Sequence, residues 1–190
     1  MGYREYAKDF EIEYTQRPGK KRPKAIRIYI GPYFQLKASP ERVRWLQWFY
    51  LASLLACAVF LLIPMCVDCA FTRIWYIQVP AAAGWIPWLL AAGSVWHLWT
   101  AKSRMEREHA DLIHDRMSGS CLFLTGFFAI SCIGCITQMT NHAASGADWL
   151  VSLCYIAGLL CSCAMFAKRK ELEMIQLENP EKPQGNRKPT

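Results

Sequence analysis

Charged residues are absent from long stretches of this 190-residue chain. The stretch from Trp45 to Val67 contains no Asp, Glu, Lys or Arg, and three further apolar stretches follow it. About 20 apolar residues in a row are enough for a helix to cross the hydrocarbon core of a bilayer. Because such runs are longer than the core helices of a soluble domain need to be, we expect an integral membrane protein.

Several catalytic motifs are absent as well. The chain has no Walker-type phosphate loop, no G-x-S-x-G, no H-E-x-x-H and no dinucleotide-binding G-x-G-x-x-G. No apolar stretch carries Asp, Glu, Lys or Arg at its centre, although ion-coupled carriers and channels usually carry such groups or clearly broken helices. These absences weigh against nucleotide-dependent, hydrolytic and ion-coupled functions, and the sequence predicts no cofactor.

The apolar stretches predict an all-α integral membrane protein, with four transmembrane helices in an antiparallel bundle. Ser39 and Pro40 are typical of the cap and the first position of a helix, which places the start of the first helix just before the membrane. Pro87 is expected to kink the second helix. The four spans are predicted at residues 45–65, 80–100, 118–139 and 149–167.

Three polar segments complete the predicted domain organisation. Residues 1–44 form a cytoplasmic segment whose alternating apolar residues predict a short β-meander. In residues 101–116, opposite charges four positions apart predict that the second helix continues beyond the membrane. Residues 168–190 are expected to be a cytoplasmic and largely disordered tail. The strands of the meander are expected at residues 10–14, 25–30 and 33–36.

The distribution of basic residues predicts how the chain is oriented. Of the 22 Lys and Arg, only Arg73 lies in the two loops that would face away from the termini. The positive-inside rule therefore predicts a multi-pass protein of the cell membrane with both termini in the cytoplasm. The formal charge of +7 has the same origin, so no nucleic-acid partner is expected. The basic run of Lys20, Lys21, Arg22 and Lys24 is expected to face lipid headgroups.

Two pairs of cysteines are candidates for redox chemistry. Cys66 and Cys69 form a C-x-x-C motif at the outer end of the first span, and Cys132 and Cys135 form a second one in the third span. On the oxidising side of the membrane, such a pair forms a redox-active or a structural disulfide, and the alternative is a set of inert thiols.

The string Cys66-Val-Asp-Cys-Ala-Phe-Thr-Arg73 resembles part of the DsbB-type quinone-coupled disulfide oxidases, four-helix membrane proteins with a C-x-x-C and a nearby arginine at the outer end of a helix. The resemblance implies a relay of electrons that includes Arg73. That family carries its second cysteine pair in a long second outer loop, whereas residues 140–148 contain no cysteine. Cys132 and Cys135 would have to replace that pair from within the membrane.

A second constellation lies in the charged segment between the second and third spans. Glu106 and His109 are three positions apart, as are Asp111 and His114. This spacing puts each carboxylate next to an imidazole on one face of a helix, as a metal site requires. The alternative interpretation is a solvated helix with balanced charges.

By elimination, the most plausible function is that of a non-catalytic scaffold, accessory or regulatory subunit of a membrane partner or of a homo-oligomer. Residues 1–44 would provide its contact surface. The first alternative is the quinone-linked thiol–disulfide oxidoreductase, and the second is a small-solute transporter. A transporter needs a polar path through the bundle, and the candidates for its lining are Thr125, Ser131, Thr137, Gln138 and Ser152.

Overall fold

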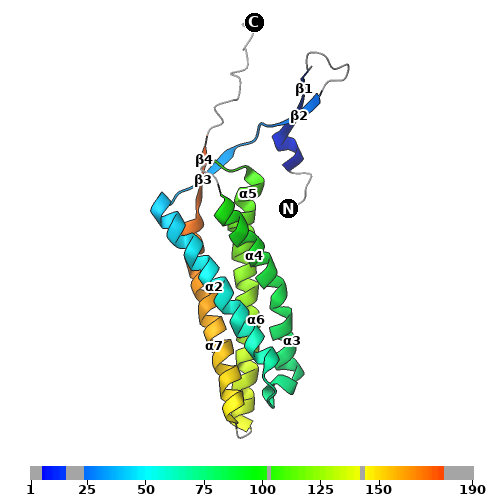
Figure 1. Ribbon diagram of the computed structural model, residues 1–190, viewed down its shortest axis with the longest axis vertical. Coiled ribbons are helices and arrows are strands. Elements are labelled where there is room, and N and C mark those ends of the chain that lie inside the picture. The colour runs from blue at the N-terminus through cyan, green and yellow to red at the C-terminus, as the bar shows by residue number, and fades with distance from the viewer. Residues whose placement is uncertain (1–5, 16–23, 102–103, 142–143, 178–190) are drawn as a thin grey trace.

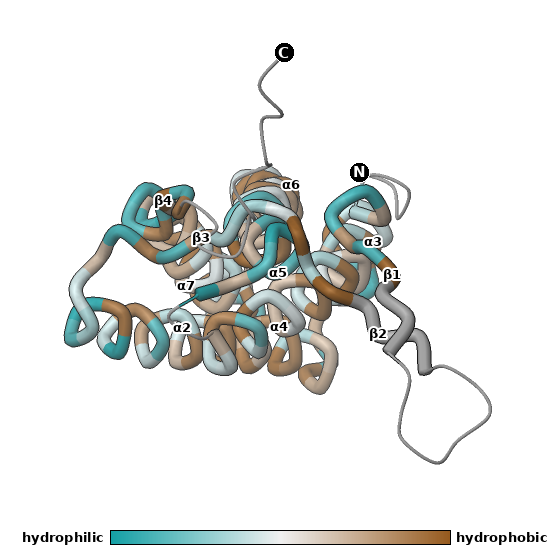
Figure 2. The backbone as a smooth tube through the Cα atoms, turned by 90° about the horizontal axis from the view of Figure 1, so that it is seen from above, coloured by the Kyte–Doolittle hydropathy of each residue, from teal (hydrophilic) through white to brown (hydrophobic). Residues whose placement is uncertain are grey.

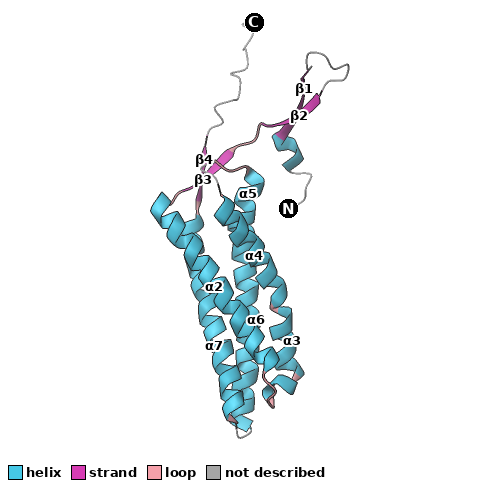
Figure 3. Cartoon of the chain, in the orientation of Figure 1, coloured by secondary structure: helices cyan, strands magenta, loops and turns pink. Residues whose placement is uncertain are grey.

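The computed structural model describes residues 6–15, 24–101, 104–141 and 144–177. Figure 1 shows a long bundle of helices with the strands gathered at one end, and Figure 3 shows that the remainder of the described chain is almost entirely helical. Within the described ranges, four helical units are long and apolar enough to cross a membrane, which confirms the four predicted helices. The units are α2 (Pro40–Cys66), α3 (Trp75–Ala83) with α4 (Trp85–Thr100), α6 (Met117–Asn141) and α7 (Gly146–Ala167).

The first helix begins where its capping sequence predicts. The Ser39 side chain accepts a hydrogen bond from the backbone N–H of Arg42 at 3.4 Å, and Pro40 occupies the first helical position. Pro40 costs nothing there because the first N–H groups of a helix have no partner within it. The long apolar helix that follows is therefore started by local chemistry.

The second helical unit differs from the prediction in its start and in its break. It begins at Trp75 rather than at Pro80, and its axis is interrupted at Gly84, between α3 and α4, rather than at Pro87. Pro87 falls in the first turn of α4, where its missing N–H removes no hydrogen bond of the helix. The predicted kink at Pro87 was therefore wrong by one helical turn.

The charged segment extends the third long helix rather than the second, contrary to the prediction. α4 ends at Thr100, and Ala101 is already out of the helical conformation. Glu106 is extended, and after it α5 (Arg107–Asp111) and a π-helical turn η3 (Leu112–Arg116) lead directly into α6. The predicted i, i+4 pair of Arg107 and Asp111 does form, with 4.0 Å between nitrogen and oxygen.

The strands form two separate sheets instead of one meander. A short 3-10 turn η1 (Ala7–Asp9) precedes β1 (Phe10–Thr15), which pairs antiparallel with β2 (Lys24–Tyr29) so that Phe10 lies opposite Tyr29. β3 (Tyr33–Leu36) does not pair with β2 but with β4 (Met174–Leu177), which follows α7. The predicted third strand exists, but its partner was wrong because Gly31 and Pro32 break the path from β2 to β3.

The same pairing corrects the prediction of a disordered tail for its first part. The chain after α7 continues as a 3-10 turn η4 (Lys168–Leu172) and then as β4, and Leu172 is fully buried. On the other side of β3, Phe34 and Met105 exchange two backbone hydrogen bonds of 2.8 and 2.9 Å. We call the assembly of β1 to β4, α5 and the stretch around Met105 the head.

Small residues allow close approach of the helices at specific points. Gly158 of α7 lies against the ring of Phe128 on α6, where an added Cβ would overlap ring atoms. Gly134 of α6 lies in the same way against Ile77 of α3. Such approaches let the helices associate through van der Waals contacts between their backbones and side chains.

The outward faces of the helices are apolar. Figure 2, which looks onto the head along the bundle, shows hydrophilic chain at α5 and apolar chain along the long helices. Many large apolar side chains of these helices are exposed, which would be costly for a protein surrounded by water. We call this surface the apolar belt, and its members include Leu55, Val59, Leu62, Val79, Ile86, Leu89, Phe123, Ile130, Ile133, Leu153 and Leu160.

Replacement of Gly158 by leucine is expected to destabilise the bundle. The added side chain would collide with Phe128, and overpacking of this kind costs about 1–3 kcal/mol. Gly126→Leu is the matched control, because Gly126 is exposed and nothing lies within 4 Å of an added Cβ there. Thermal unfolding of the purified variants measures the effect, and equal melting temperatures for the two would contradict the packing described.

Candidate functional site

Two tyrosines hold the β1–β2 hairpin to α5 within the head. The Tyr29 hydroxyl donates to the Pro32 carbonyl at 2.9 Å and accepts the backbone N–H of Arg107 at 3.0 Å. The Tyr6 hydroxyl donates to the Asp111 carboxylate at 2.8 Å. Burial and the adjacent Asp111 raise the pKa of Tyr6 to about 12. Both phenols therefore stay protonated at physiological pH and hold the β1–β2 hairpin to α5.

An ion-pair cluster ties the start of the first long helix to the end of the last one. Arg42 makes two hydrogen bonds to Glu171, of 2.7 and 2.9 Å, and Lys168 donates to the same carboxylate at 2.7 Å. The Arg42 guanidinium also stacks on the Trp45 ring, 4.3 Å from its centroid. Bidentate arginine pairs are the most specific of the surface ion pairs, so this cluster fixes α2 against η4.

The predicted metal constellation is not brought together. Among the described residues, no group of three or more His, Cys, Asp or Glu side chains is placed to hold a metal ion. Asp111 is taken by Tyr6 and Arg107, and His114 lies against Asp115 at 2.9 Å. The prediction failed because it assumed one continuous helix over residues 101–116, whereas Glu106 precedes α5 in extended chain.

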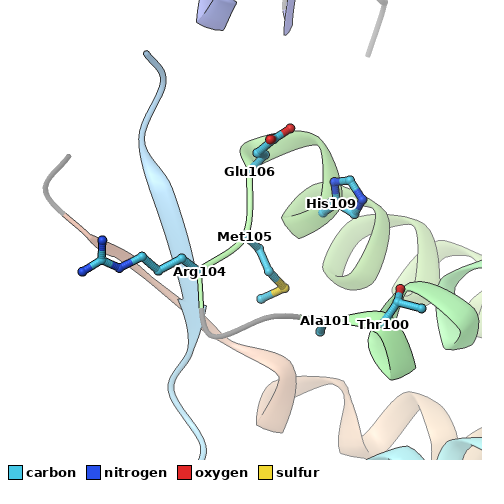
Figure 4. A pocket seen from close by; sticks show the side chains of 6 residues that line it. All are labelled: Thr100, Ala101, Arg104, Met105, Glu106 and His109. Carbon is cyan, nitrogen blue, oxygen red and sulfur yellow. The ribbon is translucent and has the colours of Figure 1, made fainter. Parts of the chain in front are cut away.

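Glu106 and His109 line a small pocket of about 130 Å³ at the base of the head. Figure 4 shows Met105 directed towards Thr100 in this pocket, while Arg104 points away from it. The ring of His109 packs edge-on against that of His97, with 5.2 Å between centroids. This contact of α5 with α4 gives His97 a structural partner that its position in the sequence did not reveal.

A buried carboxylate organises the opposite end of the bundle. Asp148 is 3% exposed, and it accepts hydrogen bonds from the Ser145 backbone N–H at 2.9 Å and the Ser145 hydroxyl at 2.7 Å. It also accepts the backbone N–H of Phe71 at 3.3 Å and the thiol of Cys69. One side chain thus caps α7 and fastens the loop between α2 and α3 to it. The predictions missed this role, although Ser145-x-x-Asp148 is a typical capping-box sequence.

The candidate redox residues lie near this end but do not form an open reactive site. All nine cysteines carry free thiols. Cys66 is exposed, whereas Cys69, Cys132 and Cys135 are buried. Cys69 donates its thiol proton to Asp148, so this sulfur is held inside the bundle and away from solvent.

Arg73, the fifth candidate of this set, faces solvent. It makes a bidentate pair with Asp68, with distances of 3.1 and 2.9 Å, and so does not approach the buried thiols. The guanidinium holds the pKa of the Asp68 carboxyl below its usual range. Asp68 and Arg73 thus close the loop on its outer surface.

The side chains that would line a polar path mostly satisfy helix carbonyls instead. The hydroxyls of Thr125 and Thr137 donate to Cys121 and Ile133 on their own helix. Ser131 donates to the carbonyl of Ile77 at 3.1 Å, Ser152 donates to that of Asp148 at 2.9 Å, and Gln138 is hydrogen-bonded to Tyr76. The bonds of Ser131 and Gln138 join α6 to α3, whereas those of Thr125, Thr137 and Ser152 stay within one helix.

The candidate lipid-headgroup run falls largely outside the described residues. Lys20, Lys21 and Arg22 lie in the undescribed range 16–23, and Lys24 is the first residue of β2.

No protein-family model, no curated protein and no solved structure matches the chain.

Replacement of Asp148 by asparagine is expected to destabilise the loop end of the bundle. The loss is expected to be about 1–3 kcal/mol, because asparagine keeps only one acceptor oxygen and turns an NH2 group towards donors that the second oxygen accepts from. Asp68→Asn is the matched control, since the Asp68–Arg73 pair is three-quarters exposed. Melting temperatures give the comparison. A smaller loss for Asp148→Asn than for Asp68→Asn would show that the buried carboxylate does not hold this end.

Proposed function

We propose that the chain is a multi-pass protein of the cell membrane with both termini in the cytoplasm. The apolar belt supports this proposal above all, because it covers the outward faces of four helices that are long enough to cross a bilayer. Exposed tryptophans near both ends of the bundle, such as Trp48 and Trp75, match the aromatic belts of membrane proteins. Lipid would cover the apolar belt, whose exposure to water is unfavourable.

The orientation follows from charge. The basic residues at the start of α2 and after α7 lie at the end of the bundle that carries the head, whereas Arg73 at the loop end is paired with Asp68. The positive-inside rule places the end with the unbalanced positive charge in the cytoplasm. The head is therefore the cytoplasmic part of the protein, and the loops around Cys66 and Asp148 face outward.

Labelling of cysteines in intact cells tests the orientation. A membrane-impermeant maleimide is expected to label the exposed Cys66 of intact cells, and the Cys66→Ser variant should lose this label. In that variant, Lys37→Cys places a thiol at a position of the head that is 66% exposed and should react only after the membrane is opened. Labelling of Lys37→Cys in intact cells would overturn the orientation, and release of the protein by alkaline carbonate would overturn membrane integration.

Within the membrane, we infer a non-catalytic role as a scaffold, accessory or regulatory subunit. The polar side chains of the bundle are used to cap helices or to join them, as Asp148 and Ser131 do. The β1–β2 hairpin of the head stands away from the bundle in Figure 1 and exposes Ile12 and Ile30. An exposed apolar surface on a hairpin outside the lipid is suited to contact another membrane protein or a second copy of this chain.

Affinity purification in mild detergent, followed by mass spectrometry, tests this role. The same associated protein, or the chain itself as an oligomer, should be recovered repeatedly with the unmodified chain. Ile12→Glu should reduce this recovery about tenfold, as expected for a residue central to an interface. Ile175→Glu is the matched control, because Ile175 is exposed to a similar degree on the other sheet. Consistent recovery of a single chain with a tightly bound quinone or metal would contradict a scaffold.

A further inference from the structure

A groove of about 300 Å³ lies where the head meets the first and second long helices. β3 forms one wall, the first two turns of α2 form another, and the end of α4 closes the base. The lining is largely apolar, and Arg44 supplies its only charged group among the described residues. The principal lining residues are Leu36, Pro40, Val43, Arg44, Gln47 and Ala101.

Arg44 differs from the other arginine at the start of α2. Arg42 is committed to Glu171, whereas Arg44 is exposed and forms no ion pair with any described acidic residue. Gln47, one turn later, uses its amide nitrogen to donate to the Leu98 carbonyl at 2.9 Å, which fixes α2 against α4 beneath the groove. The groove therefore combines apolar walls with one available positive charge at its mouth.

The groove continues into the apolar belt. Trp48 follows Arg44 by four positions, so both side chains lie on the same face of α2. Its ring packs edge-on against that of Trp99 on α4, with 5.0 Å between centroids, and it is 63% exposed. An occupant whose anionic group contacts Arg44 would place its attached apolar chains over this tryptophan pair.

We propose that this groove binds one anionic phospholipid of the cytoplasmic leaflet, with its phosphate at Arg44 and its acyl chains along Trp48 and Trp99. The inference rests on the proposed membrane location and orientation. A free phosphate would match the charge of Arg44, but it would leave the apolar walls formed by Val43 and Ala101 unused. A zwitterionic lipid such as phosphatidylcholine also carries a phosphate, but its choline cation lies next to that phosphate and opposes the charge of Arg44. An anionic lipid offers the phosphate and the acyl chains without an opposing cation.

Native mass spectrometry of the full chain in detergent tests the proposal. The probes are phosphatidylglycerol and phosphatidylcholine with identical acyl chains, and inorganic phosphate as a third. The unmodified protein should bind one phosphatidylglycerol more tightly than phosphatidylcholine, and phosphate should not compete. Arg44→Gln should weaken binding of phosphatidylglycerol about fivefold, as expected for one charge near a headgroup. Arg116→Gln, which removes an exposed charge from η3 at the same end, should change it less than twofold.

A second variant separates the shape of the groove from its charge. Ala101→Trp fills the base and keeps Arg44, so it should also lose the preference for phosphatidylglycerol while the melting temperature shows that the fold is retained. Equal weakening by Arg44→Gln and Arg116→Gln would reduce the effect to general electrostatics and overturn the site. Competition by phosphate would identify a phosphate site without a lipid. If alkaline carbonate does not extract the protein and the protein still binds the two lipids equally, the lipid site is overturned while the membrane location stands.

Discussion

The pairing of backbone polar groups within long helices governs this architecture. Four helical units satisfy their N–H and C=O groups internally over their length, so the middle of the chain can carry apolar side chains both inside and outside. Unpaired N–H and C=O groups then remain only at the helix ends, where the backbone has no partner within the helix. Ser39 and Ser145 supply the missing acceptors at the starts of α2 and α7. The polar chemistry of the protein is accordingly concentrated at the two ends of the bundle.

The two ends solve this problem differently. At the loop end, Asp148 satisfies its own helix and the backbone of Phe71 at once, and it does so from a buried position. At the head, exposed ion pairs around Glu171 are combined with strand pairing between β3 and β4. A single buried carboxylate is sufficient where the connecting loops are short. The head is built from three separate segments of the chain, which can pair through their backbones.

The parts that sequence reasoning predicted correctly are those decided by neighbouring residues. Runs of apolar residues, the cap at Ser39 and the strands β1 and β2 are local features, and the structure has all of them. The pairing of β3 with β4 is decided by the arrangement of the whole bundle and leaves no local signal. The metal constellation is not assembled for the same reason. Spacing along an assumed helix paired Glu106 with His109 and Asp111 with His114, whereas Glu106 lies in extended chain before α5. The cap formed by Asp148 is a local feature as well, because Ser145-x-x-Asp148 is a capping-box sequence, but the predictions for this end concerned the cysteines.

The sheet of β3 and β4 has a consequence for biosynthesis. Arg42 and Glu171, which pair beside this sheet, are separated by 129 positions. While the ribosome is still making the intervening helices, β3 has no strand partner, and its hydrogen-bonding edge stays open to other chains. The head can close only after α7 and β4 have emerged. Emergence of β4 is thus the event that covers the open edge of β3.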